Sequence, residues 1–302
     1  SLIKAMEKYV VEAGADIKKM TSITYINSEE KYVKDDSGNT YNYKNLIWAS
    51  DNRSLYRLLD IEKVKDVKEK QAIEKQMKTA LESHGGDSIV SVYIGTNLPK
   101  DYFSSKCTGH FFYTPLKDGL NDILYKKDEL DTTNKEEVLV WLKEYFRLNT
   151  YEIAIPGLRD SSLAPKGKTG LVISTLMDYK IVKGIQEQGW YDEFKALCET
   201  LMIDNLNKSI FKGFKNHIEV QFSSTPLTIE QRTNNTHGAI TGWGFDNGTM
   251  PAITSMPGIA KAALTPIKDV YQAGAWSYSP SGLPISILTG KLAADKVKKN
   301  LK

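Results

Sequence analysis

The spacing of hydrophobic positions changes several times along this chain, and each change predicts a different kind of element. Residues 2–13 have an apolar face with the spacing of a helix, and Gly14 follows where a helix commonly ends. This face consists of Leu2, Met6, Val10 and Val11. Apolar and polar residues then come close to alternating over 16–26 and 31–43, and the sequence DDSGN within the second segment predicts a hairpin turn. The chain thus begins with a predicted helix and a β-hairpin.

A short apolar run and a capped helix follow the hairpin. Residues 45–51 are typical of a strand buried on both faces, and Asp51 stands where it can cap a helix predicted over 51–59. A helix, a strand, a hairpin, a second strand and a second helix together are typical of part of an α/β domain. Residues 1–61 are therefore assigned to one domain.

From residue 62 a polar amphipathic helix, predicted over 62–82, leads into a run of strands. The strands are predicted at 87–98, 109–115, 151–158, 169–177 and 217–225, and further helices at 135–147 and 190–213. Strands that follow one another with few helices between them favour an antiparallel sheet. Residues 62–245 are therefore expected to form a second, α+β domain.

The last part of the chain is a predicted strand, loop and helix over 269–297. Gly274 at the end of the strand allows close approach of a ligand or of another segment, and Gly282 allows the same in the loop. Ser281 can cap the helix, and Pro284 suits its first turn. The start of this helix would offer free N–H groups to an acceptor. A strand and a helix that only close a hydrophobic core explain the same pattern.

The charge and the cysteine content exclude some classes of partner and site. The 40 basic and 37 acidic residues give a net charge of +3 and are spread along the chain, which argues against nucleic acid as a partner. Cys107 and Cys198 lack the spacing of a zinc site or a disulfide framework, so we expect no metal and a reducing, cytoplasmic setting. No apolar run reaches the roughly 18 residues of a membrane-spanning helix, and a peripheral membrane contact stays open.

Four stretches of the chain resemble one family of enzymes. VYQAGAWSYSPSGLPISILTGKLAADKV at 270–297 resembles the flavin-contacting segment of FAD-dependent oxidoreductases of the phytoene desaturase, carotenoid isomerase and retinol saturase group, which are relatives of the amine oxidases. LIKAMEKYVVEAGADIKKMTSITYI at 2–26 resembles the helix and strand of that family that pass the adenine, and TYNYKNLIWASD at 40–51 resembles its returning strand. IPGLRDSSLAPKGKTGLVISTLMDY at 155–179 is similar to a stretch of the family's substrate domain.

The resemblance implies a set of FAD-binding residues. Ile23 matches the residue whose backbone meets the adenine, and Ala49 and Ser50 match the small residues near the cofactor. The flavin-facing loop is matched by Gly274, Ala275, Ser281, Gly282, Leu283 and Pro284. One position departs from the family, because amine oxidase relatives often carry an acid after the strand glycine, whereas Ala275 and Trp276 follow it here. The contacts to the ribityl chain and the phosphates therefore stay open.

The family's dinucleotide fingerprint, G-x-G-x-x-G, does not occur in the sequence, and GWGFDNG at 242–248 has a different spacing. Because this fingerprint precedes the matched stretches in the family and the chain has no initiator Met, we expect the later part of a longer enzyme. The predicted fold is mixed, α/β and α+β, with an incomplete Rossmann-like FAD-binding domain at 1–61 and 246–302 and an antiparallel-sheet substrate domain at 62–245. Such a chain is expected to retain FAD poorly on its own.

The resemblance implies hydride transfer between an apolar substrate and FAD, and it assigns neither a catalytic residue nor an oligomeric state. His237, Trp243 and Phe245 are the predicted lining of the substrate site, and a packed loop explains them as well. Two other functions stay open. One is an FAD-dependent amine oxidase, and the other is a non-enzymatic module that binds a lipid or a partner protein.

Overall fold

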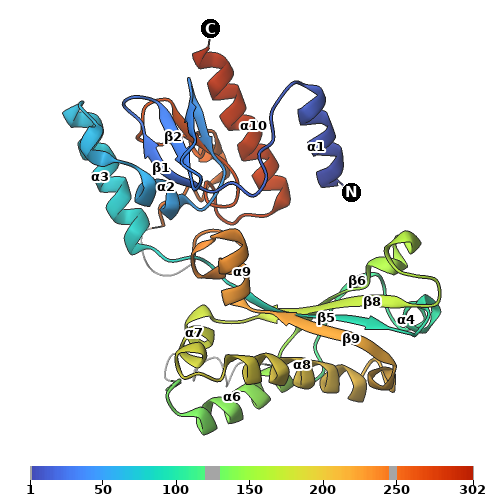
Figure 1. Ribbon diagram of the computed structural model, residues 1–302. Helices are drawn as coiled ribbons and strands as arrows, with labels where there is room; N and C mark the ends of the chain where they lie inside the picture. The colour runs from blue at the N-terminus through green and yellow to red at the C-terminus, as the bar shows by residue number, and fades with distance from the viewer. Residues whose placement is uncertain (1, 120–129, 245–249, 302) are drawn as a thin grey trace. The chain divides into compact units, whose positions relative to one another are not determined.

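The structure, a computed structural model, describes residues 2–119, 130–244 and 250–301. Contacts divide the chain into two compact units (Figure 1). One combines residues 1–82 with 249–302 and is called the split unit below, and the other, residues 83–248, is called the inserted unit. The sequence placed its domain boundaries at 61/62 and 245/246. Which residues serve the cofactor and which the substrate stays a prediction.

The split unit contains two small sheets and four helices in the described part of the chain. Its strands are β1 (Ile23–Asn27), β2 (Tyr32–Asp35), β3 (Thr40–Asn42), β4 (Leu46–Trp48) and β10 (Val270–Gln272), and its helices are α1 (Leu2–Glu12), α2 (Asn52–Leu58), α3 (Val67–Glu82) and α10 (Leu283–Asn300). The first three strands form an antiparallel sheet in the order β1-β2-β3, and β4 pairs with β10 in parallel. The predicted strand at 16–26 is therefore shorter than expected, since it begins only at Ile23.

Local side-chain hydrogen bonds explain the turn and the cap that the sequence predicts here. The Asp35 carboxylate accepts the backbone N–H groups of Ser37 and Asn39 at 3.0 and 2.8 Å, and Gly38 supplies a left-handed conformation with φ +82°. Asp51 caps α2, because its side chain accepts the N–H of Ser54 at 3.1 Å. The DDSGN hairpin and the Asp51 cap are both confirmed.

Helix α3 belongs to the split unit, whereas the sequence assigned it to the substrate domain. Its buried residues are Ile73 and Ala80, and it packs beside α2, where Arg53 donates to the carbonyl of Leu81 at 3.0 Å. Helix α1, in contrast, buries none of its residues. The sequence could not reveal this difference, because α1 has an apolar face that finds no partner among the described residues, whereas the more polar α3 packs against α2.

The inserted unit is built on one antiparallel sheet, as the sequence predicts. Its strands lie in the order β6 (His110–Tyr113), β7 (Tyr151–Ala154), β8 (Thr169–Leu176), β5 (Ile89–Thr96) and β9 (Ile218–Ser224). Its helices are α4 (Lys100–Ser104), α6 (Lys135–Leu148), α7 (Tyr179–Glu187), α8 (Tyr191–Lys208) and α9 (Pro226–Thr233). Figure 1 shows α6, α7 and α8 below the sheet, on one of its faces. The other face bears side chains considered below.

The hydrophobic core of the inserted unit lies between the sheet and these helices. Strand β8 alternates between buried and half-buried positions, so that every second side chain enters the core. Both the strands and the helices contribute residues to this core, among them Val92, Phe146, Ile153, Ile173 and Phe194. The strand predicted at 151–158 ends at Ala154, because Pro156 has no N–H for a strand ladder and instead begins a short 3₁₀ turn.

The two ends of the inserted unit are joined by backbone hydrogen bonds. The N–H of Gly86 donates to the carbonyl of Gly242 at 2.7 Å, and that of Gly244 donates to the carbonyl of His84 at 3.0 Å. The backbones approach so closely that a Cβ on Gly85 would lie 2.4 Å from the carbonyl oxygen of Thr236. Only glycine fits this position. Residues 84–86 and 242–244, which these hydrogen bonds connect, are called the join below.

Candidate functional site

The ends of the two parallel strands lie side by side and continue into the loops predicted to meet FAD. The N–H of Ala273 donates to the carbonyl of Trp48 at 2.9 Å, which extends the β4–β10 pairing. Gly274 has φ +88°, and a Cβ there would lie 3.4 Å from the carbonyl oxygen of Ala49. Its N–H donates to the hydroxyl of Thr289 in α10 at 3.0 Å. The structure thus brings together Gly274 and Ala49, which the sequence predicted separately.

A polar pair lies immediately below these strand ends. The side-chain amide of Asn52 donates to the side-chain carbonyl of Gln272, whose own amide donates to the carbonyl of Ala262 at 2.9 Å. The Oδ1 atom of Asn52 is buried and has no hydrogen-bond partner. A buried acceptor without a donor costs free energy. Ser50, which precedes the capped turn, is exposed, as is Ala49.

The loop between β10 and α10 holds two further buried hydroxyls without a partner. They are Oγ of Ser279 and Oγ of Ser281. The prediction that Ser281 caps α10 is wrong, because the helix begins one residue later, with Gly282 at the N-cap and no side-chain cap. The Ser281 hydroxyl is thereby left without the backbone N–H it was expected to accept.

The first turn of α10 is accessible. Gly282, Leu283 and Pro284 are exposed, and Ala275 and Ser281 are half-buried. Because α10 runs for 18 residues and has no capping side chain, its first N–H groups and the positive end of its dipole face outward. The predicted exposed start of the helix is therefore present, with glycine in place of serine as the cap.

The adenine-side prediction falls at the start of β1. Ile23 is half-buried and pairs with Asp35 on β2. At the other end of the strand, the side-chain Nδ2 of Asn27 is buried and without a partner, while its Oδ1 accepts the N–H of Glu30 at 2.9 Å. The segments at 23–27, 49–52 and 274–284 thus each hold or adjoin a predicted cofactor residue and a buried polar atom with unused hydrogen-bonding capacity.

His237 takes part in a polar contact of the inserted unit. Its φ is +60°, its N–H donates to Glu230 at 2.9 Å, and its ring centroid lies 4.8 Å from that of Tyr179. Tyr179 donates to Glu230 at 2.7 Å, and burial, together with this carboxylate, raises the pKa of Tyr179 to about 12. These contacts hold His237 in a turn, and its predicted substrate role stays a prediction.

The other two predicted substrate residues differ in what the structure describes. Trp243 is fully buried and bridges to Gly85 at the join of the inserted unit. That is the packing expected of a structural loop. Phe245 lies outside the described residues.

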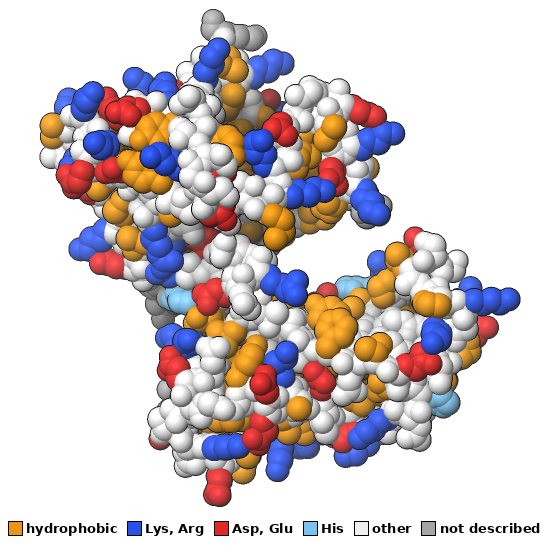
Figure 2. All heavy atoms as spheres, viewed as in Figure 1, with side chains coloured by type: hydrophobic (Ala, Val, Ile, Leu, Met, Phe, Trp, Pro, Cys, Tyr) orange, Lys and Arg blue, Asp and Glu red, His pale blue; other side chains and the backbone are white. Residues whose placement is uncertain are grey.

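Sequence reasoning did not predict the apolar surface that Tyr93, Val220 and Phe222 form on the open face of the five-stranded sheet. Tyr93 on β5 and Phe222 on β9 pair across the strands and stack with ring centroids 4.8 Å apart. Phe222 and Val220 remain 57% and 55% exposed, and on β6 Phe112 is 68% exposed. Hydrophobic side chains gather over this part of the sheet in Figure 2. Alternation along 217–225 was the available signal, since it places Val220 and Phe222 on one face.

No group of three or more His, Cys, Asp or Glu residues stands where it could hold a metal ion in the described ranges. Among the described helices, none combines the length and apolar character needed to cross a membrane. Figure 2 shows basic and acidic side chains interspersed over the viewed face.

Known proteins resemble this chain in part of its sequence and in its fold. No family model matches the sequence. Over 153 residues the chain is 29% identical to 4,4'-diapophytoene desaturase (4,4'-diaponeurosporene-forming) of Staphylococcus aureus, both in strain bovine RF122 / ET3-1 and in strain Newman. The match covers 49% of this chain and 29% of the desaturase. The chain thus spans less than a third of the length of these curated relatives.

Solved structures extend the likeness to the whole chain. An oxidoreductase from Methanosarcina mazei superposes with a TM-score of 0.56 and 14% identity, covering 98% of this chain and 53% of that one. A putrescine oxidase variant from a redesign of its cofactor binding superposes with a TM-score of 0.54 and 11% identity, covering 96% of this chain and 51% of that one. The chain shares its fold with these two structures, and about half of its sequence is similar to the desaturase. The similarity to the desaturase confirms the predicted resemblance, and the structure has the predicted mixture of helices and antiparallel sheets.

Proposed function

We propose that this chain forms the flavin-edge and substrate portions of an FAD-dependent oxidoreductase that transfers a hydride between an apolar substrate and FAD. The observation that carries the proposal is the set of buried polar atoms without partners in the split unit. Four of them, on Asn27, Asn52, Ser279 and Ser281, lie in or beside the segments predicted to contact FAD. Buried polar atoms are ordinarily satisfied, so a polar ligand at these segments explains them.

The residues present fit parts of FAD. The exposed start of α10 offers N–H donors and a positive dipole end, which suit the electron-rich oxygens of a flavin's pyrimidine edge. The hydroxyls of Ser279 and Ser281 can donate or accept. Gly274 keeps the space beside Ala49 open to an approaching ligand. When bound, FAD supplies a ring that accepts or gives up a hydride.

The pyrophosphate of FAD has no matching cradle in this sequence. The G-x-G-x-x-G motif, whose glycines bring backbone N–H groups close to the phosphates, does not occur. We therefore propose that the chain alone retains FAD weakly and that a segment carrying such a motif supplies the phosphate contacts. A colourless chain after incubation with FAD and desalting is the expected result, and a retained flavin band would contradict this part of the proposal.

The apolar substrate is supported by the open face of the five-stranded sheet. Stacked aromatic rings at Tyr93 and Phe222, with Val220 and Phe112 exposed beside them, form a surface that an extended hydrocarbon can cover. The sequence relative is named for the desaturation of 4,4'-diapophytoene. We propose an apolar substrate of the polyene class for this protein as well.

The test uses the protein expressed at the full length of its gene and purified with FAD bound. A polyene such as a diapophytoene is added without oxygen, and flavin absorbance is followed. We expect the polyene to bleach the flavin and putrescine to leave it unchanged. The reverse result would assign the protein to the amine oxidases, and bleaching by neither compound, with FAD bound, would remove the proposed substrate class.

A further inference from the structure

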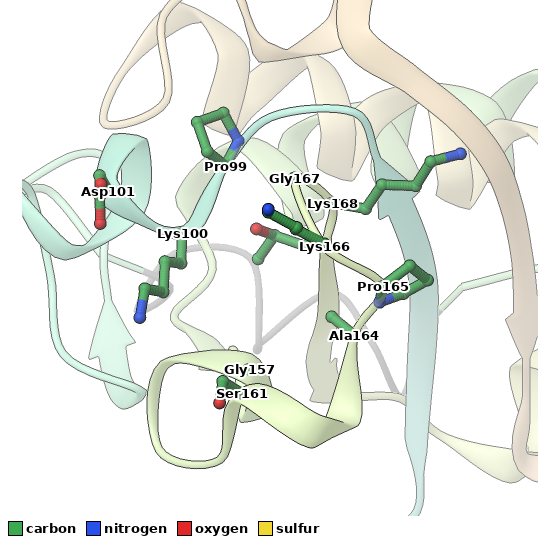
Figure 3. A pocket seen from close by; sticks show the side chains of 11 residues that line it. Pro99, Lys100, Asp101, Gly157, Ser161, Ala164, Pro165, Lys166, Gly167 and Lys168 are labelled. Carbon is green, nitrogen blue, oxygen red and sulfur yellow. The ribbon is translucent and has the colours of Figure 1, made fainter.

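A pocket of about 410 Å³ lies in the inserted unit. It is formed by the start of α4, the loop that follows β7 and the beginning of β8 (Figure 3). Its lining residues are Pro99, Lys100, Asp101, Gly157, Ser161, Ala164, Pro165, Lys166, Gly167, Lys168 and Thr169. Eight of these residues lie within 155–179, the stretch similar to part of the family's substrate domain, but the proposed function gives none of them a contact.

The charge of the pocket is predominantly positive. Three lysines and one aspartate line it. Lys168 pairs with Glu219 at 2.6 Å, and in Figure 3 its side chain points away from that of Lys166. Within the described residues, Lys100 and Lys166 have no carboxylate at ion-pair distance. In Figure 3 the side chains of Lys100 and Lys166 extend in different directions, and an anion in the pocket would attract both ammonium groups.

Short-range hydrogen bonds hold the walls in place. The N–H of Lys168 donates to the carbonyl of Pro165 at 3.0 Å, which closes a turn at Gly167 with φ +78°. The buried hydroxyl of Thr169 donates to the carbonyl of Leu98 at 2.8 Å, and so ties this loop to the segment before α4. The side chain of Asp160 accepts the N–H of Ser162 at 3.0 Å. Lysines on such a fixed loop lose little backbone freedom when they bind an anion.

An exposed leucine stands on the same loop. Leu163 is 63% exposed, three residues before Lys166. An apolar side chain next to unpaired cations is the combination that anchors proteins at anionic lipid surfaces. The same cations also suit a small free phosphate compound. The shared chemistry of both ligands is the phosphate group.

We propose that this pocket is a binding site for a phosphate group, held by Lys100 and Lys166. The site is independent of the flavin chemistry, because no residue that lines it is among the predicted FAD or substrate contacts. The carboxylate of Asp101, which also lines the pocket, repels an anion, so the two lysines must outweigh it.

The test compares the 302-residue chain with a double variant, Lys100→Gln with Lys166→Gln, and with a matched control, Lys168→Gln. Pyrophosphate binding is measured by calorimetry at low salt. Binding to vesicles is measured by co-sedimentation with phosphatidylcholine alone and with added phosphatidylglycerol. Circular dichroism checks that each variant folds. Removing two cations near an anionic surface is expected to weaken binding by about thirtyfold, and the control by much less.

Each outcome decides the proposal. Pyrophosphate binding that the double variant loses supports the site with a free phosphate compound as its ligand. Binding only to phosphatidylglycerol vesicles, lost in the double variant and weakened by Leu163→Ser, supports it with a lipid headgroup. Absence of both kinds of binding, or equal losses in the double variant and the control, would overturn it.

Discussion

The two units of this chain differ in their hydrophobic packing and in how many of their buried polar atoms lack a hydrogen-bond partner. The inserted unit packs one contiguous core between a five-stranded sheet and its helices. The split unit has short strands, a helix α1 without buried residues, and six of the eight described buried polar atoms that lack a hydrogen-bond partner. Unsatisfied groups of this kind cost stability unless a ligand or another segment meets them. Most of the hydrophobic packing thus lies in the inserted unit, and most of the unsatisfied side-chain atoms lie in the split unit.

The largest expected effect comes from a substitution in the hydrophobic core of the inserted unit. Phe194 on α8 is fully buried, and its ring lies 6.4 Å from that of Trp190. Phe194→Ala removes a large buried ring, and we expect the free energy of unfolding to fall by about 3–5 kcal/mol. Hydrogen exchange followed by mass spectrometry should show the loss in α6 and α8.

The matched control is Phe112→Ala on the open sheet face, where the ring is 68% exposed. It should change the free energy of unfolding by less than about 0.5 kcal/mol. Equal losses of stability in both variants would mean that the packing between the sheet and α8 does not distinguish the two faces.

A smaller effect tests the ligand chemistry of the split unit. Gly274→Ala and Gly38→Ala both put a side chain at a left-handed backbone position, φ +88° and +82°, and each should cost about 1 kcal/mol of stability. Nothing lies within 4 Å of a Cβ at Gly38, whereas a Cβ at Gly274 enters the space beside Ala49. In the full-length protein, only Gly274→Ala should lower FAD occupancy, measured as flavin absorbance per protein. Equal occupancy in both variants would contradict a flavin contact at Gly274.

The smallest effect is the response of the split unit to acid. The side-chain hydrogen bond from Asn39, with others from Tyr41 and the turn backbone, lowers the pKa of Asp35 below its usual value. A carboxyl whose pKa is lower when folded stabilises the fold above its unfolded pKa, and this contribution is lost as pH falls through the folded pKa. The split unit should therefore weaken below about pH 4.

Asp35→Asn is the variant that isolates this contribution. It should lower the melting temperature at neutral pH and flatten the dependence on pH below about pH 4. Asp36→Asn, at the exposed neighbouring position, serves as the control and should leave the acid dependence as in the parent. An unchanged acid profile in Asp35→Asn would show that Asp35 is not the titrating group.

Local features of this fold were readable from the sequence. The Asp51 cap and the DDSGN turn depend on side chains that bond to backbone within four residues. The antiparallel sheet was also predictable, because the predicted strands followed one another with few helices between them. Helices α7 and α9 were not predicted, although capping side chains at Asp178 and Thr225 begin them, since both are only two to three turns long.

Features that depend on contacts between distant segments could not be predicted from the sequence. The alternation of 217–225 did not reveal that Phe222 would stack on Tyr93, because the pairing of β9 with β5 joins residues more than a hundred positions apart. The cap of α10 was misplaced by one residue, since serine and glycine both suit that position and the loop backbone decided between them. The buried hydroxyls at Ser279 and Ser281 became visible only with the neighbours that fail to satisfy them.

The backbone join at 84–86 and 242–244 has a consequence for the order of folding. Strands β4 and β10 pair in parallel although the whole inserted unit separates them in the chain, and closing so long a loop is entropically costly and slow. Once the inserted unit has folded and its ends are held together, the open loop between Leu46 and Val270 shrinks to roughly a third of its length, which lowers the closure cost by about 1 kcal/mol. The larger unit is thus expected to fold first and to bring the two parts of the smaller one within reach.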